Sequence, residues 1–96
     1  MAVLRHPGWT SVTVSVRYFA GAQAAAGTAE EQVTLRAPAG LSALTEELVH
    51  RHGEALARVL TAASYIVDEV ATGPGEAARE LADGARVDVL PPFAGG

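Results

Sequence analysis

The 96-residue chain has no cysteine, no lysine and no long apolar run. Without cysteine, a disulfide scaffold, a thiolate-held zinc or iron–sulfur site and a cysteine nucleophile are excluded. The apolar stretches fall well short of the roughly 18 residues that a membrane-spanning helix needs. Residues 1–10 include Arg5, Pro7 and Gly8 where a signal peptide would need an apolar core. We therefore expect a soluble cytoplasmic domain without a membrane segment.

Positive charge is also scarce, since 7 basic residues face 11 acidic ones and the formal net charge is −4. Nonspecific nucleic-acid binding depends on neutralising phosphates with lysine and arginine, so we expect no nucleic-acid partner. Every basic residue is an arginine. A GC-rich genome would explain this bias, as the many alanines also suggest. The functional alternative is a surface without side-chain amines that could attack an activated acyl group.

The remaining composition is typical of one small globular domain, with 49% hydrophobic and 19% charged residues. Residues 12–18 alternate β-branched or aromatic side chains with polar ones, which predicts a strand with one buried face. Residues 33–36 repeat the pattern. The small, glycine-bounded segment 21–29 is interpreted as their connection. The two strands should form an antiparallel hairpin.

After residue 40 the spacing of the hydrophobic residues changes from the strand period to the helical period. Leu41, Leu44 and Leu48 have helical spacing, with Ser42 as the expected N-cap and Gly53 as the expected C-cap. A heptad-like spacing of this kind places the leucines on one face of a helix. This segment is therefore predicted to be the principal helix of the domain.

A second helical piece is expected over residues 54–60. Residues 64–68 and 87–90 return to strand character, the latter after a tight-turn signal at Asp83-Gly84. The predicted order is β-β-α-β-β, an α+β domain with one principal helix packed on a sheet. The domain is expected over residues 11–90, with a flexible N-terminal extension at 1–10 and an extended tail at 91–96.

The body of the chain offers no convincing catalytic or metal site. His50 and His52 are two residues apart on a predicted helix and so point away from each other, while His6 lies in the extension. We expect no metal site. The pairs Glu30-Glu31 and Glu46-Glu47 could serve carboxylate catalysis, but a solvated polar face is the preferred interpretation. The serines lie outside any nucleophile-elbow pattern.

The end of the chain is the candidate functional site. Leu90 precedes a proline, which favours extended backbone at Leu90. Pro91 and Pro92 cannot donate hydrogen bonds to a sheet. They should end the last strand and act as a stiff stalk. The site comprises Leu90, Pro91, Pro92, Phe93, Ala94, Gly95 and Gly96.

Beyond the prolines, Phe93 offers one large apolar ring that could anchor in a partner's pocket. Ala94, Gly95 and Gly96 then reduce the chain to nearly bare backbone. Glycine has no Cβ to obstruct attack on the terminal carboxylate or its passage through a narrow channel. Six residues beyond Leu90 can span roughly 20 Å, far enough to enter another protein's active site.

With this tail, the chain resembles the ubiquitin-like sulfur carriers, most of all the small, sulfur-carrier subunits of molybdopterin synthase. The likeness also includes residues 16–20, residues 51–53 and residues 81–84. It implies a β-grasp fold, in which a mixed sheet curls around the principal helix. One departure is Asp68-Glu69, which stands where many relatives turn through asparagine and glycine.

The resemblance also implies a chemistry. A ubiquitin-activating-like adenylyltransferase would use ATP to adenylate Gly96, and a sulfur donor protein would convert it to a thiocarboxylate. The tail would then enter the large subunit of molybdopterin synthase and give sulfur to the pterin precursor of the molybdenum cofactor. Gly95 and Ala94 would give access, while Phe93 and the prolines would position the tail. The chain itself would be a non-catalytic subunit that binds no cofactor.

Other functions remain open at this level. The same tail could serve a sulfur carrier for thiamine thiazole or cysteine synthesis. A protein modifier joined to target lysines, or a β-grasp interaction module without acyl chemistry, would also fit. The Leu-Pro-Pro sequence before the Phe-Ala-Gly-Gly end favours molybdopterin synthesis among the carriers.

Overall fold

The computed structural model describes residues 10–72, 76 and 78–92. Of the predicted N-terminal extension, only Thr10 falls within this part, and its carbonyl accepts a hydrogen bond from the Ala37 N–H at 2.8 Å. The elements in chain order are β1 (Ser11–Tyr18), α1 (Gly21–Ala26), β2 (Glu30–Arg36), α2 (Leu41–His52), α3 (Glu54–Ala62), β3 (Ser64–Val67), β4 (Val70–Thr72) and β5 (Arg86–Leu90).

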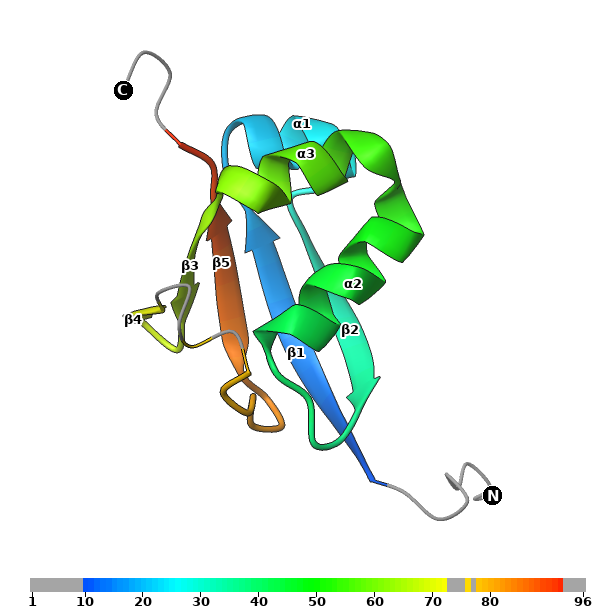
Figure 1. Cartoon of the computed structure of the whole chain (residues 1–96), viewed down its shortest axis with the longest axis vertical. Helices are drawn as coiled ribbons and strands as arrows, with labels where there is room; N and C mark the ends of the chain where they lie inside the picture. Colours follow the sequence, from blue (N-terminus) through cyan, green and yellow to red (C-terminus); the bar gives the residue numbers. More distant parts are fainter. Residues whose placement is uncertain (1–9, 73–75, 77, 93–96) are drawn as a thin grey trace.

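The five strands form one mixed sheet in the order β2-β1-β5-β3-β4. Strand β1 runs antiparallel to β2, as predicted, and parallel to β5. Strand β3 is antiparallel to both β5 and β4. Figure 1 shows α2 crossing in front of β1 and β2, with α3 and α1 above α2 in this view. This sheet around a principal helix confirms the predicted β-grasp fold. Among the described residues, no helix covers the opposite face of the sheet.

The core lies between the sheet and the helices. Strand β1 alternates strictly between partly exposed and buried residues, which confirms the period-two prediction. Fully buried valines of β1 and β5 meet the leucines of α2 and α3, and burying each such side chain contributes roughly 1.5–3 kcal/mol. The largest fully buried side chains are Leu44, Leu48, Leu56, Val14, Val16, Val33, Val87 and Val89.

Two local predictions about the first half were wrong. The segment 21–29 is not a plain connection, because it contains the six-residue helix α1, which buries Ala22 and Ala26. Helix α2 has Gly40, not Ser42, as its N-cap. Gly40 is extended and forms an isolated bridge to Glu80, so its carbonyl already accepts the N–H of Leu44 at 3.1 Å. A long-range contact thus begins the helix earlier. Gly53 is confirmed as the C-cap.

The second half of the chain contains three strands, β3, β4 and β5, where the sequence predicted two. Strand β3 ends at Val67, so Asp68 lies outside it, and β4 follows as a strand that the sequence did not predict. Asp68 and Glu69 have φ values of 48° and 71°. Positive φ at both central positions is the requirement of the type I′ hairpin turn, which asparagine and glycine normally satisfy. Asp68 is held there by Arg86, whose N–H donates to the Asp68 carboxylate at 2.9 Å.

Within the described residues, no helix is long and apolar enough to cross a membrane.

Candidate functional site

The C-terminal tail begins where the last strand of the sheet ends. Strand β5 ends at Leu90, which pairs with Ser64 of β3, and Pro91 and Pro92 follow outside the strand. Pro92 is exposed, and the last described residues, red in Figure 1, lead away from the sheet. The predicted site residues Phe93, Ala94, Gly95 and Gly96 lie outside the described residues. The structure therefore locates the base of the tail.

An exposed aromatic side chain lies beside this base. The last register pair of the parallel strands β1 and β5 is Tyr18 with Val89, and both of these residues are buried. Because successive side chains alternate between sheet faces, the next residues, Phe19 and Leu90, belong to the opposite, open face. The Phe19 N–H donates to the Val89 carbonyl at 3.2 Å. Phe19 is 37% exposed and, with Val70, is one of the two exposed large hydrophobic side chains among the described residues.

An ion pair lies on the open face beside Phe19. The Arg17 Nε donates to Oδ1 of Asp88 at 2.9 Å, and Nη2 donates to Oδ2 at 3.1 Å. The hydrogen bond and charge of Asp88 raise the pKa of Arg17. The guanidinium carbon also lies 5.4 Å from the centroid of the Phe19 ring. We call Arg17, Phe19, Asp88 and Leu90 the tail-base patch.

On the covered face, three polar side chains contact Glu31. The Tyr18 hydroxyl and the His52 Nε2 both contact Oε2 of Glu31, the latter at 2.6 Å, and the Arg51 Nη1 donates to Oε1 at 3.2 Å. The rings of Tyr18 and His52 meet edge to face with centroids 6.1 Å apart. This Glu31 cluster ties the end of α2 to β1 and β2. It joins the segments 16–20 and 51–53, which carried the family resemblance.

Burial and hydrogen bonding act in opposite directions on the Glu31 cluster. Burial by itself would raise the pKa of Glu31, but hydrogen bonds from Tyr18, His52 and Arg51 outweigh it and hold that pKa below its ordinary value. The pKa of Tyr18 is raised, chiefly by burial and also by the hydrogen bond to Glu31 and its negative charge. Glu31 therefore stays ionised and Tyr18 protonated at neutral pH. This arrangement stabilises the fold and offers no nucleophile.

The sequence analysis missed both the tail-base patch and the Glu31 cluster. Glu31 was assigned to a solvated face, although it shares the strand parity of the buried residues Val33 and Leu35. That parity was the available signal. No sequence signal pointed to the Arg17–Asp88 pair, because its members are 71 positions apart in the chain. Only the parallel pairing of β1 and β5 brings them together. Among the described residues, no group of three histidine or acidic side chains could hold a metal.

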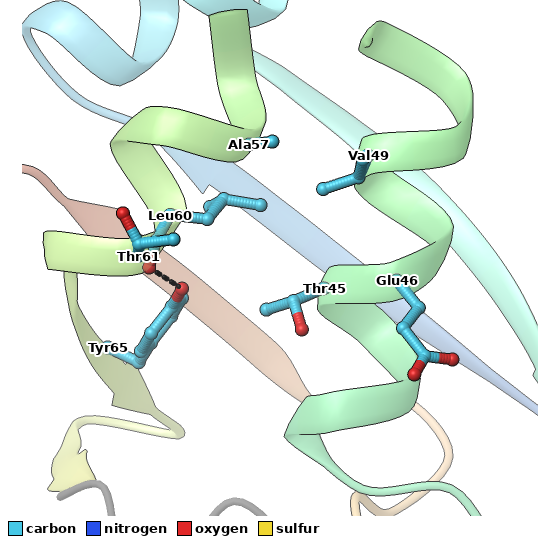
Figure 2. Close-up of a pocket in the computed structure, with 7 residues that line it drawn as sticks. All are labelled: Thr45, Glu46, Val49, Ala57, Leu60, Thr61 and Tyr65. Carbon is cyan, nitrogen blue, oxygen red and sulfur yellow. Dashed lines mark hydrogen bonds between the residues drawn. The ribbon is translucent and has the colours of Figure 1, made fainter. Parts of the chain in front are cut away.

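A groove of about 420 Å³ lies between α2 and α3 (Figure 2). The hydroxyl of Tyr65 donates to the Leu60 carbonyl at 2.9 Å, drawn as a dashed line in the figure. The hydroxyls of Thr61 and Thr45 also donate to backbone carbonyls. These groups are engaged in local hydrogen bonds, so the groove presents an apolar surface rather than a reactive site. Its lining residues are Thr45, Glu46, Val49, Ala57, Leu60, Thr61 and Tyr65.

Comparison with known proteins places the fold among small ubiquitin-like proteins. The model of the ThiS family matches residues 16–96. A Pyrococcus furiosus protein assigned as molybdopterin converting factor subunit 1 is 28% identical, with a TM-score of 0.71 over 85% of this chain and 99% of that one. Subunit 1 in the complex of subunits 1 and 2 of the Helicobacter pylori molybdopterin-converting factor is 25% identical, with a TM-score of 0.61 over 88% and 100% of the two chains.

A further structural relative is SAMP1 from Haloferax volcanii, at 22% identity and a TM-score of 0.74 over 88% of this chain and 99% of that one. This level of identity indicates a shared fold alone. Among curated proteins, none matches the chain significantly.

Proposed function

We propose that the C-terminal Gly96 carries sulfur for molybdopterin synthesis. The premise is that the chain belongs to the ThiS family of ubiquitin-like sulfur carriers. The coarser assignment is that of a small sulfur carrier or ubiquitin-like modifier, a type of protein that is generally non-catalytic. The observation that carries the proposal is the base of the tail. Strand β5 ends at Leu90, and Pro91 and Pro92 direct the chain out of the sheet toward the terminal glycines.

The proposed chemistry begins with activation of the terminal carboxylate. A carboxylate is a poor acyl donor, so a ubiquitin-activating-like adenylyltransferase would join it to AMP, and ATP would lose pyrophosphate. A donor supplying sulfur at the oxidation level of hydrosulfide would then attack the carboxyl carbon of Gly96. The carbon–sulfur bond forms as the bond to AMP breaks, which leaves a thiocarboxylate. The chain needs no bound cofactor, because ATP is a substrate of the partner.

The identity of the relatives supports molybdopterin as the destination. Two neighbours with at least 25% identity are named as molybdopterin-converting factor subunits, and one of them is in complex with subunit 2. We therefore propose the large subunit of molybdopterin synthase as the partner that accepts the tail. In that partner, Phe93 would anchor the tail, while Ala94 and Gly95 would let it pass a narrow entrance. The reaction would take place in the cytoplasm.

Intact-mass spectrometry tests the proposal. The purified chain is incubated with the ubiquitin-activating-like enzyme of its source organism, ATP and sulfide. The expected product is heavier by the replacement of one oxygen by sulfur, and it should transfer sulfur to the pterin precursor when the large subunit is added. A chain lacking Gly96 is the control and should stay unmodified. An unmodified full-length chain, or one found joined to lysines of other proteins, would contradict the sulfur-carrier assignment.

A further inference from the structure

We propose that Arg17 and Asp88 are positioning residues that hold the Phe19 ring in place for the protein that covers the base of the tail. This inference rests on the proposed function, because it assumes an activating enzyme that docks where the tail emerges. It adds a role for two residues outside the tail.

The first step is the rigidity of the Arg17–Asp88 pair. Two hydrogen bonds of 2.9 and 3.1 Å join the guanidinium fork to both carboxylate oxygens. The pair lies at matched register positions of the parallel strands β1 and β5. Only 15% of the Asp88 side chain is exposed, so the carboxylate is a fixed partner. Two-point contacts of this kind set the orientation of the guanidinium plane, which a single contact would leave free to rotate.

The second step is the contact between Arg17 and Phe19. The two residues share the open face because they are two apart in the chain, and Phe19 continues the extended backbone of β1 by one residue through its hydrogen bond to Val89. The guanidinium carbon lies 5.4 Å from the ring centroid, within the range of a cation–π interaction. The hydrogen bond from the Phe19 N–H to Val89 fixes the backbone of Phe19. The side-chain torsions of this partly exposed ring are therefore the remaining freedom, and the guanidinium restricts them.

The third step concerns what happens when Asp88 is lost. Glu30 of β2 occupies the register position on the other side of Arg17, and its charge also raises the pKa of Arg17. Without the Asp88 carboxylate, the guanidinium has an alternative acidic partner on the β2 side. It would move away from β5 and lose its position over Phe19. Asp88 thus acts through Arg17, and Arg17 acts through Phe19.

The consequence should appear when a partner binds. Ordering one free side chain on binding lowers affinity about three- to tenfold. A ring that is already held avoids this loss. Disrupting the pair should therefore raise the KM for the carrier in the adenylation reaction and leave kcat almost unchanged, since neither residue reaches the terminal carboxylate.

The experiment measures ATP–pyrophosphate exchange by the ubiquitin-activating-like enzyme of the source organism against carrier concentration. Arg17→Met and Asp88→Asn should each raise the KM about three- to tenfold, and the double variant should be no worse than Arg17→Met alone. Arg17→Lys keeps the charge but not the fork, and should resemble Asp88→Asn. The matched control is Arg58→Met, which removes the same charge from the exposed face of α3.

A second measurement needs no partner. Nuclear Overhauser contacts between the Phe19 ring and the Arg17 side chain should be present in the parent and weaken in Asp88→Asn, with the melting temperature recorded in parallel. Unchanged contacts in Asp88→Asn, an unchanged KM in Arg17→Met, or full activity of Arg17→Lys would each overturn the inference. If the parent chain itself supports no exchange, the proposed function fails, and the ring contacts still decide whether the pair positions Phe19.

Discussion

Removing the Glu31 carboxylate should destabilise the fold in a pH-dependent way. Glu31 is 16% exposed and accepts hydrogen bonds from Tyr18, His52 and Arg51. In Glu31→Gln the side chain keeps its shape but loses its charge and part of its acceptor capacity. Hydrogen bonds to charged groups contribute about 1.5–3 kcal/mol each, and a buried donor left without an acceptor costs about 1–3 kcal/mol.

These contributions do not simply add, because Arg51 is partly exposed and also binds Glu47 at 3.0 Å, so it retains a partner. The main loss is the hydrogen bond from Tyr18, which is only 2% exposed and has no free access to water. We therefore expect Glu31→Gln to lower the free energy of unfolding by about 2 kcal/mol at pH 7. For a domain of this size, that corresponds to a fall in melting temperature of roughly 8–16 °C.

The direction of the pH effect follows from the lowered pKa of Glu31. A carboxylate whose pKa is lower in the folded state stabilises the protein above its unfolded pKa, near 4.3, and this stabilisation is lost as the pH falls through the folded pKa. The difference between parent and Glu31→Gln should therefore be largest above about pH 5 and shrink at lower pH.

Urea unfolding of both proteins between pH 7 and pH 3 measures this difference. Glu46→Gln removes an exposed charge from the middle of α2 and is the matched control, with an expected change within about 0.5 kcal/mol. A parent–variant difference that stays constant across this pH range would refute the electrostatic reasoning and leave only a packing effect.

The remaining predictions concern the tail, the turn and the missing lysines. Deleting Gly96 should abolish thiocarboxylate formation in the intact-mass assay without lowering the melting temperature, because the carboxylate moves back by about 3.5 Å and reaction is sensitive to misplacements of about 1 Å. Glu69→Gly should raise the urea midpoint, with a gain of about 0.5–1 kcal/mol, because it relieves a φ of 71°. Arg86→Lys should yield more covalent oligomer than the parent with activating enzyme and ATP but no sulfur source; equal amounts would argue against a protective role for the missing lysines.

Elements with a strong burial period could be predicted from the sequence. The alternation of β1 and the leucine spacing of α2 both follow from a core on one side, so local residues suffice. Helix α1 was missed because its buried residues, Ala22 and Ala26, carry little hydrophobic signal. The start of α2 at Leu41 depends on the bridge between Gly40 and Glu80, which no local pattern encodes.

The same distinction applies to the candidate site. The tail was recognisable because two prolines and two glycines restrict or free the backbone by themselves. The base of the tail was not, because the Arg17–Asp88 contact depends on which strands become neighbours. Strands β1 and β5 are the ends of the domain in sequence and the centre of its sheet in space. Side chains that meet across such a pairing are visible only once the topology is known.

Stability and recognition should be separable at the end of β1, because neighbouring residues of a strand face opposite sides of the sheet. Tyr18 points inward to Glu31, while Arg17 points to Asp88 on the open face. We expect Glu31→Gln to lower the melting temperature without changing the KM for activation at a temperature where the variant is folded. Arg17→Met should do the reverse, since a partly exposed ion pair contributes under about 1 kcal/mol. Melting curves and exchange kinetics on both single variants and their combination measure the two effects. If Glu31→Gln raised the KM as much as Arg17→Met, the two faces would be coupled through the strand, and the open-face pair would have no separate role in positioning Phe19.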